Sequence, residues 1–152
     1  MVYAAETRGE ATSPRDRFKA LPFFLDTLIP ADSTPSATQL GLDRALLQHA
    51  DGIENYTRLL ELGCEWLDKS STSLHRITFD GLNPEQREAV VTLSETSPDT
   101  SVQRMFFERV RFDLFGLYYA SPASWDGLGI SSPPQPTGYL NYMQPPAKPR
   151  RG

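Results

Sequence analysis

The side chains best suited to chemistry in this chain are two histidines, one cysteine and scattered carboxylates. His49 lies two residues before Asp51, a spacing that suggests an acid/base pair, whereas the first carboxylate after His75 is Asp80. Because His49 falls at the predicted end of a helix, we expect its ring to interact with the last helical carbonyl groups instead. An enzyme that uses His49 or His75 is therefore the weakest of our hypotheses, and we predict no catalytic residue.

The remaining reactive groups are expected to have structural roles rather than to form a metal or cofactor site. Cys64, the single cysteine, lies within a helical pattern, where a buried small hydrophobic residue is expected more often than a reactive thiol. A zinc site requires a cluster of cysteine and histidine that the sequence does not contain. Four carboxylates repeat at helical spacing, without the Glu-x-x-His motif of a di-metal bundle: Glu54, Glu61, Glu65 and Asp68. We predict no metal and no cofactor in this chain.

Charge and hydropathy argue against two classes of partner. The net charge is −4 and the pI is about 5.1, so neither a nucleic-acid backbone nor an anionic membrane surface is favoured. No segment approaches the roughly 18 apolar residues that a membrane span requires. Arg15, Arg17 and Lys19 precede an apolar run that faintly resembles a signal peptide, but Pro22 and Asp26 interrupt that run. We interpret it as the first helix of a domain.

Helical periodicity is the main structural signal. Apolar residues recur at three- and four-residue spacing in five segments, which we predict to be helices over residues 14–28, 37–50, 53–67 or slightly beyond, 84–96 and 102–120. The clearest start is Asn83-Pro84-Glu85-Gln86, which offers a capping side chain, proline at the first position and glutamine for a capping box. Residues 70–76 are predicted to be a polar linker, after which Phe79 and Leu82 anchor the loop to the core.

These elements predict an all-α fold, a small helical bundle of about five helices with an extended Pro/Tyr-rich C-terminal tail. No alternating apolar and polar run of strand length stands out in the sequence. We divide the chain into a disordered N-terminus over residues 1–13, the bundle over residues 14–120 and an extended arm over residues 121–152. In the last two helices, the positions that carry the helical stripe are Ala89/Val90, Leu93, Val102, Met105/Phe106, Arg109/Val110, Leu114 and Leu117/Tyr118.

The arm is the segment most suited to binding another protein. Seven of the thirteen prolines lie beyond residue 120, and proline stiffens an unpaired segment so that less entropy is lost on docking. Tyrosine and tryptophan suit interfaces because they combine a large apolar body with a polar tip. The residues that we predict to bind a partner are Tyr118, Tyr119, Trp125, Pro136, Tyr139, Tyr142 and Met143. The alternative is that Tyr118, Tyr119 and Trp125 fold back as a lid on the bundle.

Two short blocks of sequence carry a family resemblance. The first is Leu28-Ile29-Pro30-Ala31-Asp32, followed by Ser36-Ala37 and Gly41. The second comprises Phe106-Phe107, Arg111, Gly116, Tyr118-Tyr119, Pro122, Leu128-Gly129, Pro136 and Gly138-Tyr139. In order and spacing these blocks resemble the gluconate 2-dehydrogenase subunit 3 family, the small subunits of bacterial flavin dehydrogenases. The resemblance spans about residues 18 to 145, with the middle similar only in its helical pattern.

The resemblance implies a role in a complex. The partner would be a large FAD-containing catalytic subunit of the glucose-methanol-choline (GMC) type that oxidises a hydroxyl of a sugar, sugar acid or glycoside, and some complexes add a cytochrome c subunit. The small subunit would stabilise, mature or co-export that partner and hold no flavin itself. Many members carry a twin-arginine signal that this sequence does not show, so a periplasmic location by co-export and a cytoplasmic one both stay open. The alternative function is a free-standing helical protein-binding module without a dehydrogenase partner.

Overall fold

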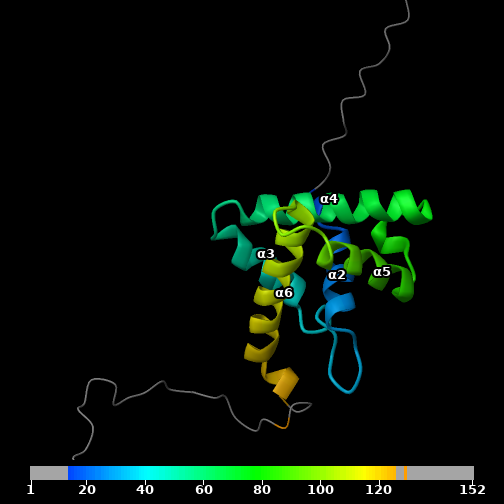
Figure 1. The fold of residues 1–152 in the computed structure, drawn as a ribbon. Helices are drawn as coiled ribbons and strands as arrows, with labels where there is room; N and C mark the ends of the chain where they lie inside the picture. Colours follow the sequence, from blue (N-terminus) through cyan, green and yellow to red (C-terminus); the bar gives the residue numbers. More distant parts are fainter. Residues whose placement is uncertain (1–13, 126–128, 130–152) are drawn as a thin grey trace, which may run out of the picture.

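The protein folds into helices joined by loops, as the sequence predicts (Figure 1). The computed structural model describes residues 14–125 and residue 129, and these contain no strand. After the single turn α1 (Pro14–Arg17) come α2 (Ala20–Leu28), α3 (Leu42–Asp51), α4 (Tyr56–His75), η1 (Phe79–Gly81), α5 (Pro84–Glu95), α6 (Val102–Ala120) and η2 (Pro122–Ser124). The all-α prediction is confirmed. The predictions for residues 1–13 and for most of the arm lie outside the described residues.

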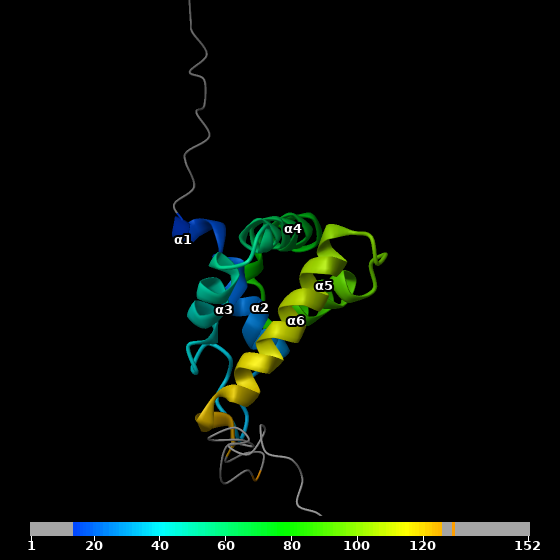
Figure 2. The ribbon, with the colours of Figure 1, turned by 90° about the vertical axis from the view of Figure 1, so that its left-hand side faces the viewer.

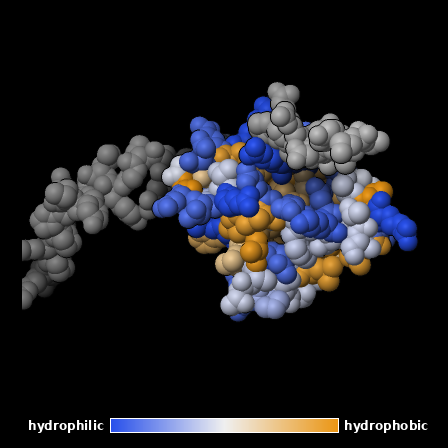
Figure 3. All heavy atoms as spheres, turned by 90° about the horizontal axis from the view of Figure 1, so that it is seen from above, coloured by the Kyte–Doolittle hydropathy of each residue, from blue (hydrophilic) through white to orange (hydrophobic). Residues whose placement is uncertain are grey.

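Helix α4 lies across one end of α2 and α6, an arrangement visible from two directions (Figure 1, Figure 2). The loop between α2 and α3 lies at the opposite end of the molecule, together with the C-terminal end of α6. Seen from above, the face that carries α4 has hydrophilic side chains interspersed among hydrophobic ones (Figure 3). Helix α6 packs against α3, α4 and α5, so its position depends on most of the bundle.

One core of buried apolar side chains joins the five long helices. Its largest fully buried members include Phe24, Phe79 and Phe106, and the ring centroids of Phe24 and Phe106 lie 4.8 Å apart. A Cβ atom added to Gly63 would come within 2.1 Å of the Phe106 ring, so glycine permits the close packing of α4 on α6. Phe79 and Leu82 are both buried, which confirms that they anchor the loop after α4.

Helix α4 is longer than the sequence predicts. Residues 70–76, expected to be a linker, instead continue the helix to His75, and Arg76 leaves it with a φ of 62°. Within this extension the buried Ser71 hydroxyl donates a hydrogen bond to the Leu67 carbonyl at 2.6 Å. The linker prediction is wrong because serine and threonine hydroxyls can bond to the carbonyl four residues earlier and so remain satisfied within a helix.

The first two predicted helices also differ in their bounds. The first is divided, because the chain leaves α1 at Arg17 and becomes helical again at Ala20. Pro22 therefore lies in the first turn of α2, where its missing N–H costs no helical hydrogen bond. The second begins at Leu42 rather than at residue 37, after Gly41 with a φ of 71°. A left-handed residue cannot continue an α-helix, so residues 37–41 form turns instead.

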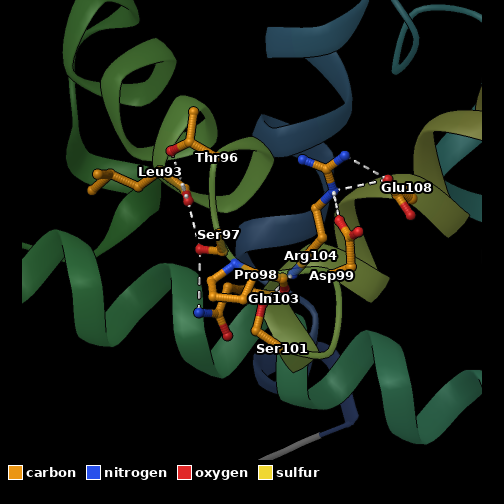
Figure 4. A network of polar contacts seen from close by, with 9 residues as sticks. All are labelled: Leu93, Thr96, Ser97, Pro98, Asp99, Ser101, Gln103, Arg104 and Glu108. Carbon is orange, nitrogen blue, oxygen red and sulfur yellow. Dashed lines mark hydrogen bonds and ion pairs between the residues drawn. The ribbon is translucent and has the colours of Figure 1, made fainter.

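Side-chain caps fix the start of the last two helices. The Asn83 side chain accepts a hydrogen bond from the Gln86 N–H at 2.9 Å, and Gln86 Oε1 accepts one from the Asn83 N–H at 3.1 Å. This is the capping box that the sequence predicts. In the turn that follows α5, Ser101 caps α6 by accepting a hydrogen bond from the Arg104 N–H at 3.3 Å, and Gln103 bonds Ser97 across the turn (Figure 4). These bonds set the direction of α6.

Candidate functional site

Two segments far apart in sequence meet at the end of the molecule opposite α4. Tyr118, near the end of α6, is 7% exposed, and its hydroxyl donates a hydrogen bond to Thr34 Oγ1 at 2.9 Å. The Thr34 backbone N–H and hydroxyl both donate to Asp32 Oδ1, at 2.8 and 3.0 Å. These two bonds, the backbone one foremost, lower the pKa of the Asp32 carboxyl. The early and late motif blocks of the sequence thus belong to one local structure.

The chain folds back on itself directly after α6. The buried Ser124 hydroxyl lies 2.7 Å from the Tyr118 carbonyl oxygen and 2.8 Å from that of Ser121. The indole N–H of Trp125 donates to the Tyr119 carbonyl at 2.8 Å. The last carbonyl groups of a helix have no partner within it, so η2 and Trp125 supply the missing donors. Trp125 consequently lies beside Tyr119.

The structure brings together three of the residues predicted to bind a partner. Tyr118 is largely buried, whereas Tyr119 is 53% exposed, and their rings meet edge to face with centroids 5.6 Å apart. Tyr119 also stacks on Phe115, and Trp125 is half-buried beside them. Four further residues lie outside the described part of the chain: Pro136, Tyr139, Tyr142 and Met143. The partner-binding role of all seven stays a prediction.

A polar cluster that sequence reasoning missed lies between α3, α4 and α6. His49 Nε2 is 3.7 Å from Asp113 Oδ2, and the same oxygen accepts a 2.8 Å hydrogen bond from Arg109 Nε. The Arg109 guanidinium lies over the Tyr56 ring, 4.7 Å from its centroid. The structure therefore places His49 beside Asp113 rather than pairing it with Asp51. Sequence spacing could not show this contact, because it joins different helices.

Tyr56 is the polar group of this cluster whose hydrogen-bonding capacity is least satisfied. Its hydroxyl is buried and has no hydrogen-bond partner of acceptable geometry among the described residues. Burial, reinforced by the nearby Asp113 carboxylate, raises the pKa of this phenol. A phenol held in its protonated form does not act as a base. The cluster is an ion pair between Arg109 and Asp113 that packs against the Tyr56 ring.

The other reactive groups are also occupied in structural contacts. Cys64 is 1% exposed, and burial raises the pKa of its thiol to about 12. His75 Nδ1 lies 3.4 Å from Gln86 Nε2. Within residues 14–125 and residue 129, no three His, Cys, Asp or Glu side chains are grouped as metal ligands would be. Among the helices of that same part, none is both long and apolar enough to span a membrane.

Helix α6 carries exposed apolar residues on the side away from the core. We call Val102, Met105, Phe112 and Tyr119 the outer stripe of α6; they are 37%, 43%, 80% and 53% exposed. The prediction that Val102 and Leu93 face the core is wrong, since Leu93 is 45% exposed, and of the pair Met105/Phe106 only Phe106 is buried. The outer-stripe residues are three or seven positions apart, which is the spacing of one helix face. Because α6 is apolar on two faces, this spacing does not show which face is buried. The core takes the other face, with Phe106, Val110 and Leu114.

Comparison with known proteins places most of the chain in one family. A family model described as gluconate 2-dehydrogenase subunit 3 matches residues 15–130. This range contains α2 to α6, the early motif block, and the late block as far as Leu128-Gly129. Neither the curated proteins nor the solved structures give a match.

Proposed function

Because the chain belongs to the gluconate 2-dehydrogenase subunit 3 family, we propose that it is a non-catalytic small subunit that binds and stabilises an FAD-dependent dehydrogenase. The partner would be of the GMC type and would oxidise a hydroxyl of a sugar, sugar acid or glycoside. In this proposal FAD and substrate are bound by the partner, and a cytochrome c subunit is a further candidate component. The small subunit would act during maturation or co-export by holding its partner in a folded, assembled state.

The observation that carries this proposal is the hydrogen bond between Tyr118 and Thr34. It joins the two motif blocks of the family at one end of the molecule. Tyr119 and Trp125 lie at the same end, where the described chain leaves the bundle. A rigid aromatic base followed by a proline-rich arm is well suited to clasping another protein, because the base does not need to become ordered on binding.

The environments of the reactive side chains favour an accessory role over an active site. Cys64 is buried with a raised thiol pKa, and the Ser124 hydroxyl is within bonding distance of two carbonyl groups. His49 lies beside Asp113, but Arg109 also bonds that carboxylate. A histidine base acts on a nucleophile within hydrogen-bond reach, and the described contacts of His49 include no serine, threonine or cysteine. These contacts support a subunit whose work is binding.

Removing the arm tests the proposal. We would coexpress the chain with an FAD-containing GMC-type catalytic subunit from the same source and delete residues 131–152. We expect co-purification and dehydrogenase activity with an artificial electron acceptor to fall together. Deletion of residues 2–12 serves as a control for chain shortening. Undiminished co-purification and activity after the C-terminal deletion would refute the arm's role, and failure of the full chain to bind would refute the proposed function.

The alternative, a free-standing helical binding module, is favoured by one set of contacts. Tyr118 packs into the core and Trp125 bonds the Tyr119 carbonyl, so this part of the tail folds back on the bundle. The two functions differ in what the isolated chain does. Both would be monomeric and melt cooperatively, but only a module would hold an immobile tail without any dehydrogenase subunit. NMR relaxation of residues 131–152 in the isolated chain would distinguish them.

A further inference from the structure

We propose that the outer stripe of α6 is the surface on which the FAD-containing catalytic subunit docks, with the Phe112 ring inserted into an apolar pocket of that subunit. This inference rests on the proposed function and adds to it a docking face separate from the C-terminal arm. The arm would hold the partner, and the stripe would determine where the partner sits.

The exposure of Phe112 is the first argument. Its side chain is 80% exposed in the middle of a 19-residue helix, with Met105 and Tyr119 exposed on either side of it. From Val102 to Tyr119 the stripe is about 26 Å long at 1.5 Å per helical residue. Large aromatic residues left in water at the centre of an apolar surface mark interaction sites, because burying them contributes more than burying any other side chain.

The shape of the surface is the second argument. A groove of about 730 Å³ lies between the first half of α4 and the N-terminal half of α6, and Leu59, Leu62, Met105 and Phe112 are among its lining residues. A second groove of about 720 Å³ lies between Phe112 and Tyr119. Phe112 lines both grooves, so its ring stands between two hollows. A complementary partner would offer a pocket for this ring, flanked by two projections that fill the hollows.

The charges beside the stripe are the third argument. The Arg104 guanidinium is 2.7 Å from Glu108 and 3.8 Å from Asp99 (Figure 4), and Arg109 bonds Asp113 at 2.8 Å. Because these charges are paired within the chain, a partner does not need to neutralise them. Arg111 and Glu54, which also line the grooves, form no ion pair with another described residue. We therefore expect a protein surface that is apolar along the stripe and carries opposing charges at its edge.

Continuity with the arm identifies that surface as the clasped catalytic subunit. The stripe ends at Tyr119, whose carbonyl accepts the hydrogen bond from Trp125. Trp125, the last residue described before the arm's undescribed part, therefore lies at the C-terminal end of the stripe. A partner held by the arm would meet Tyr119 first and then extend along α6 toward Phe112. The two surfaces would form one interface without a gap between them.

A single introduced thiol tests where the partner sits. Cys64 is buried, so a Phe112→Cys variant carries one accessible thiol for maleimide labelling. We expect labelling in the complex to be at least roughly tenfold slower than in the free chain, because the core of an interface excludes solvent. Leu74→Cys, at a residue of α4 that is 55% exposed, is the matched control and should label equally fast in both states. Equal labelling of both variants in the complex would overturn the proposal.

Affinity measurements separate this inference from the proposed function. We expect Phe112→Ser to weaken binding of the catalytic subunit by roughly 30-fold or more, the effect of losing an anchoring aromatic residue. Leu74→Ser should leave binding unchanged, and both variants should melt as the unaltered chain does. If the unaltered chain binds and Phe112→Ser binds equally well, the docking face is wrong while the proposed function stands. If the unaltered chain does not bind, the proposed function itself fails.

Two other occupants would overturn the proposal. If a second copy of the chain covered the stripe, light scattering would show a dimer, and Phe112→Ser would convert it to a monomer. If the chain's own residues 131–152 covered the stripe, deleting them would make the Phe112→Cys variant label faster in the free chain. We expect neither result: the free chain should be a monomer, and the deletion should not change its labelling rate.

Discussion

The Tyr118 hydroxyl donates a 2.9 Å hydrogen bond to Thr34 Oγ1 across 84 residues of chain. Thr34 in turn donates to Asp32, which closes the motif Ile29-Pro30-Ala31-Asp32 against the end of α6. Two blocks that are far apart in sequence are thus joined through Thr34, where the loop after α2 packs against the last helix. The position of Tyr119, Trp125 and the start of the arm depends on this contact.

Loss of that hydrogen bond should destabilise the bundle measurably. We expect Tyr118→Phe to lower the free energy of unfolding in urea by about 1 kcal/mol, because the ring stays packed and only the hydroxyl is lost. Tyr119→Phe is the control, since Tyr119 is half exposed and should show almost no change. In a double-mutant cycle with Thr34→Ala, the combined effect should be smaller than the sum of the two single effects. Strict additivity would show that the two hydroxyls do not interact.

The packing of α4 on α6 should depend on Gly63. We expect Gly63→Ala to destabilise the protein by about 3 kcal/mol or more, because the added methyl group would overlap the fully buried Phe106 ring. Gly116→Ala is the matched control within α6, where an added Cβ meets no atom within 4 Å. It should instead stabilise the helix by about 0.5–1 kcal/mol. Thermal melts of both variants test this, and equal effects at the two glycines would contradict it.

The buried thiol should make stability depend on alkaline pH. Burial raises the pKa of Cys64 to about 12, whereas an unfolded cysteine has a pKa of about 8.5. Below about pH 8.5 both states keep the proton, so the full stability is present. Above it only the unfolded state ionises, and the free energy of unfolding should fall by up to about 1.4 kcal/mol per pH unit.

Urea unfolding of the unaltered chain and of Cys64→Ala, between pH 8 and pH 10.5, measures this slope. The variant lacks the thiol and should therefore lose stability less steeply. Its remaining pH dependence comes from groups common to both proteins, such as Tyr56, whose pKa is raised in the folded state. The native thiol should also resist thiol reagents until the protein unfolds. Parallel pH dependences for the two proteins would show that the thiol ionises equally easily in the folded state.

Two positions with positive φ should respond in opposite directions. Gly41 precedes α3 with a φ of 71° and open space around it, so Gly41→Ala should cost about 1–2 kcal/mol from backbone strain alone. Arg76 ends α4 with a φ of 62°, and Arg76→Gly should relieve a similar strain and stabilise the protein by up to about 1 kcal/mol. Urea midpoints measure both changes. A loss of stability in Arg76→Gly would show that the Arg76 side chain matters more than its backbone.

Local sequence signals predicted the elements whose physics is local. The capping box at Asn83 and the end of α2 before Pro30 follow from hydrogen bonding and sterics within a few residues, and both were read correctly. The prediction of a linker over residues 70–76 failed because composition alone does not show that the Ser71 hydroxyl finds a carbonyl inside the helix. The family was also recognised from the sequence, and the family model confirms it over residues 15–130.

The sequence by itself determined the all-α class, the approximate helices, the family and the absence from the chain of a cysteine and histidine cluster. Only the tertiary structure decided which face of α6 is buried, because both faces of that helix are apolar and the choice depends on what packs against it. The same holds for the contacts of Tyr118 with Thr34 and of His49 with Asp113. Such pairs are separated by many residues, and spacing along the chain carries no information about how helices pack on one another.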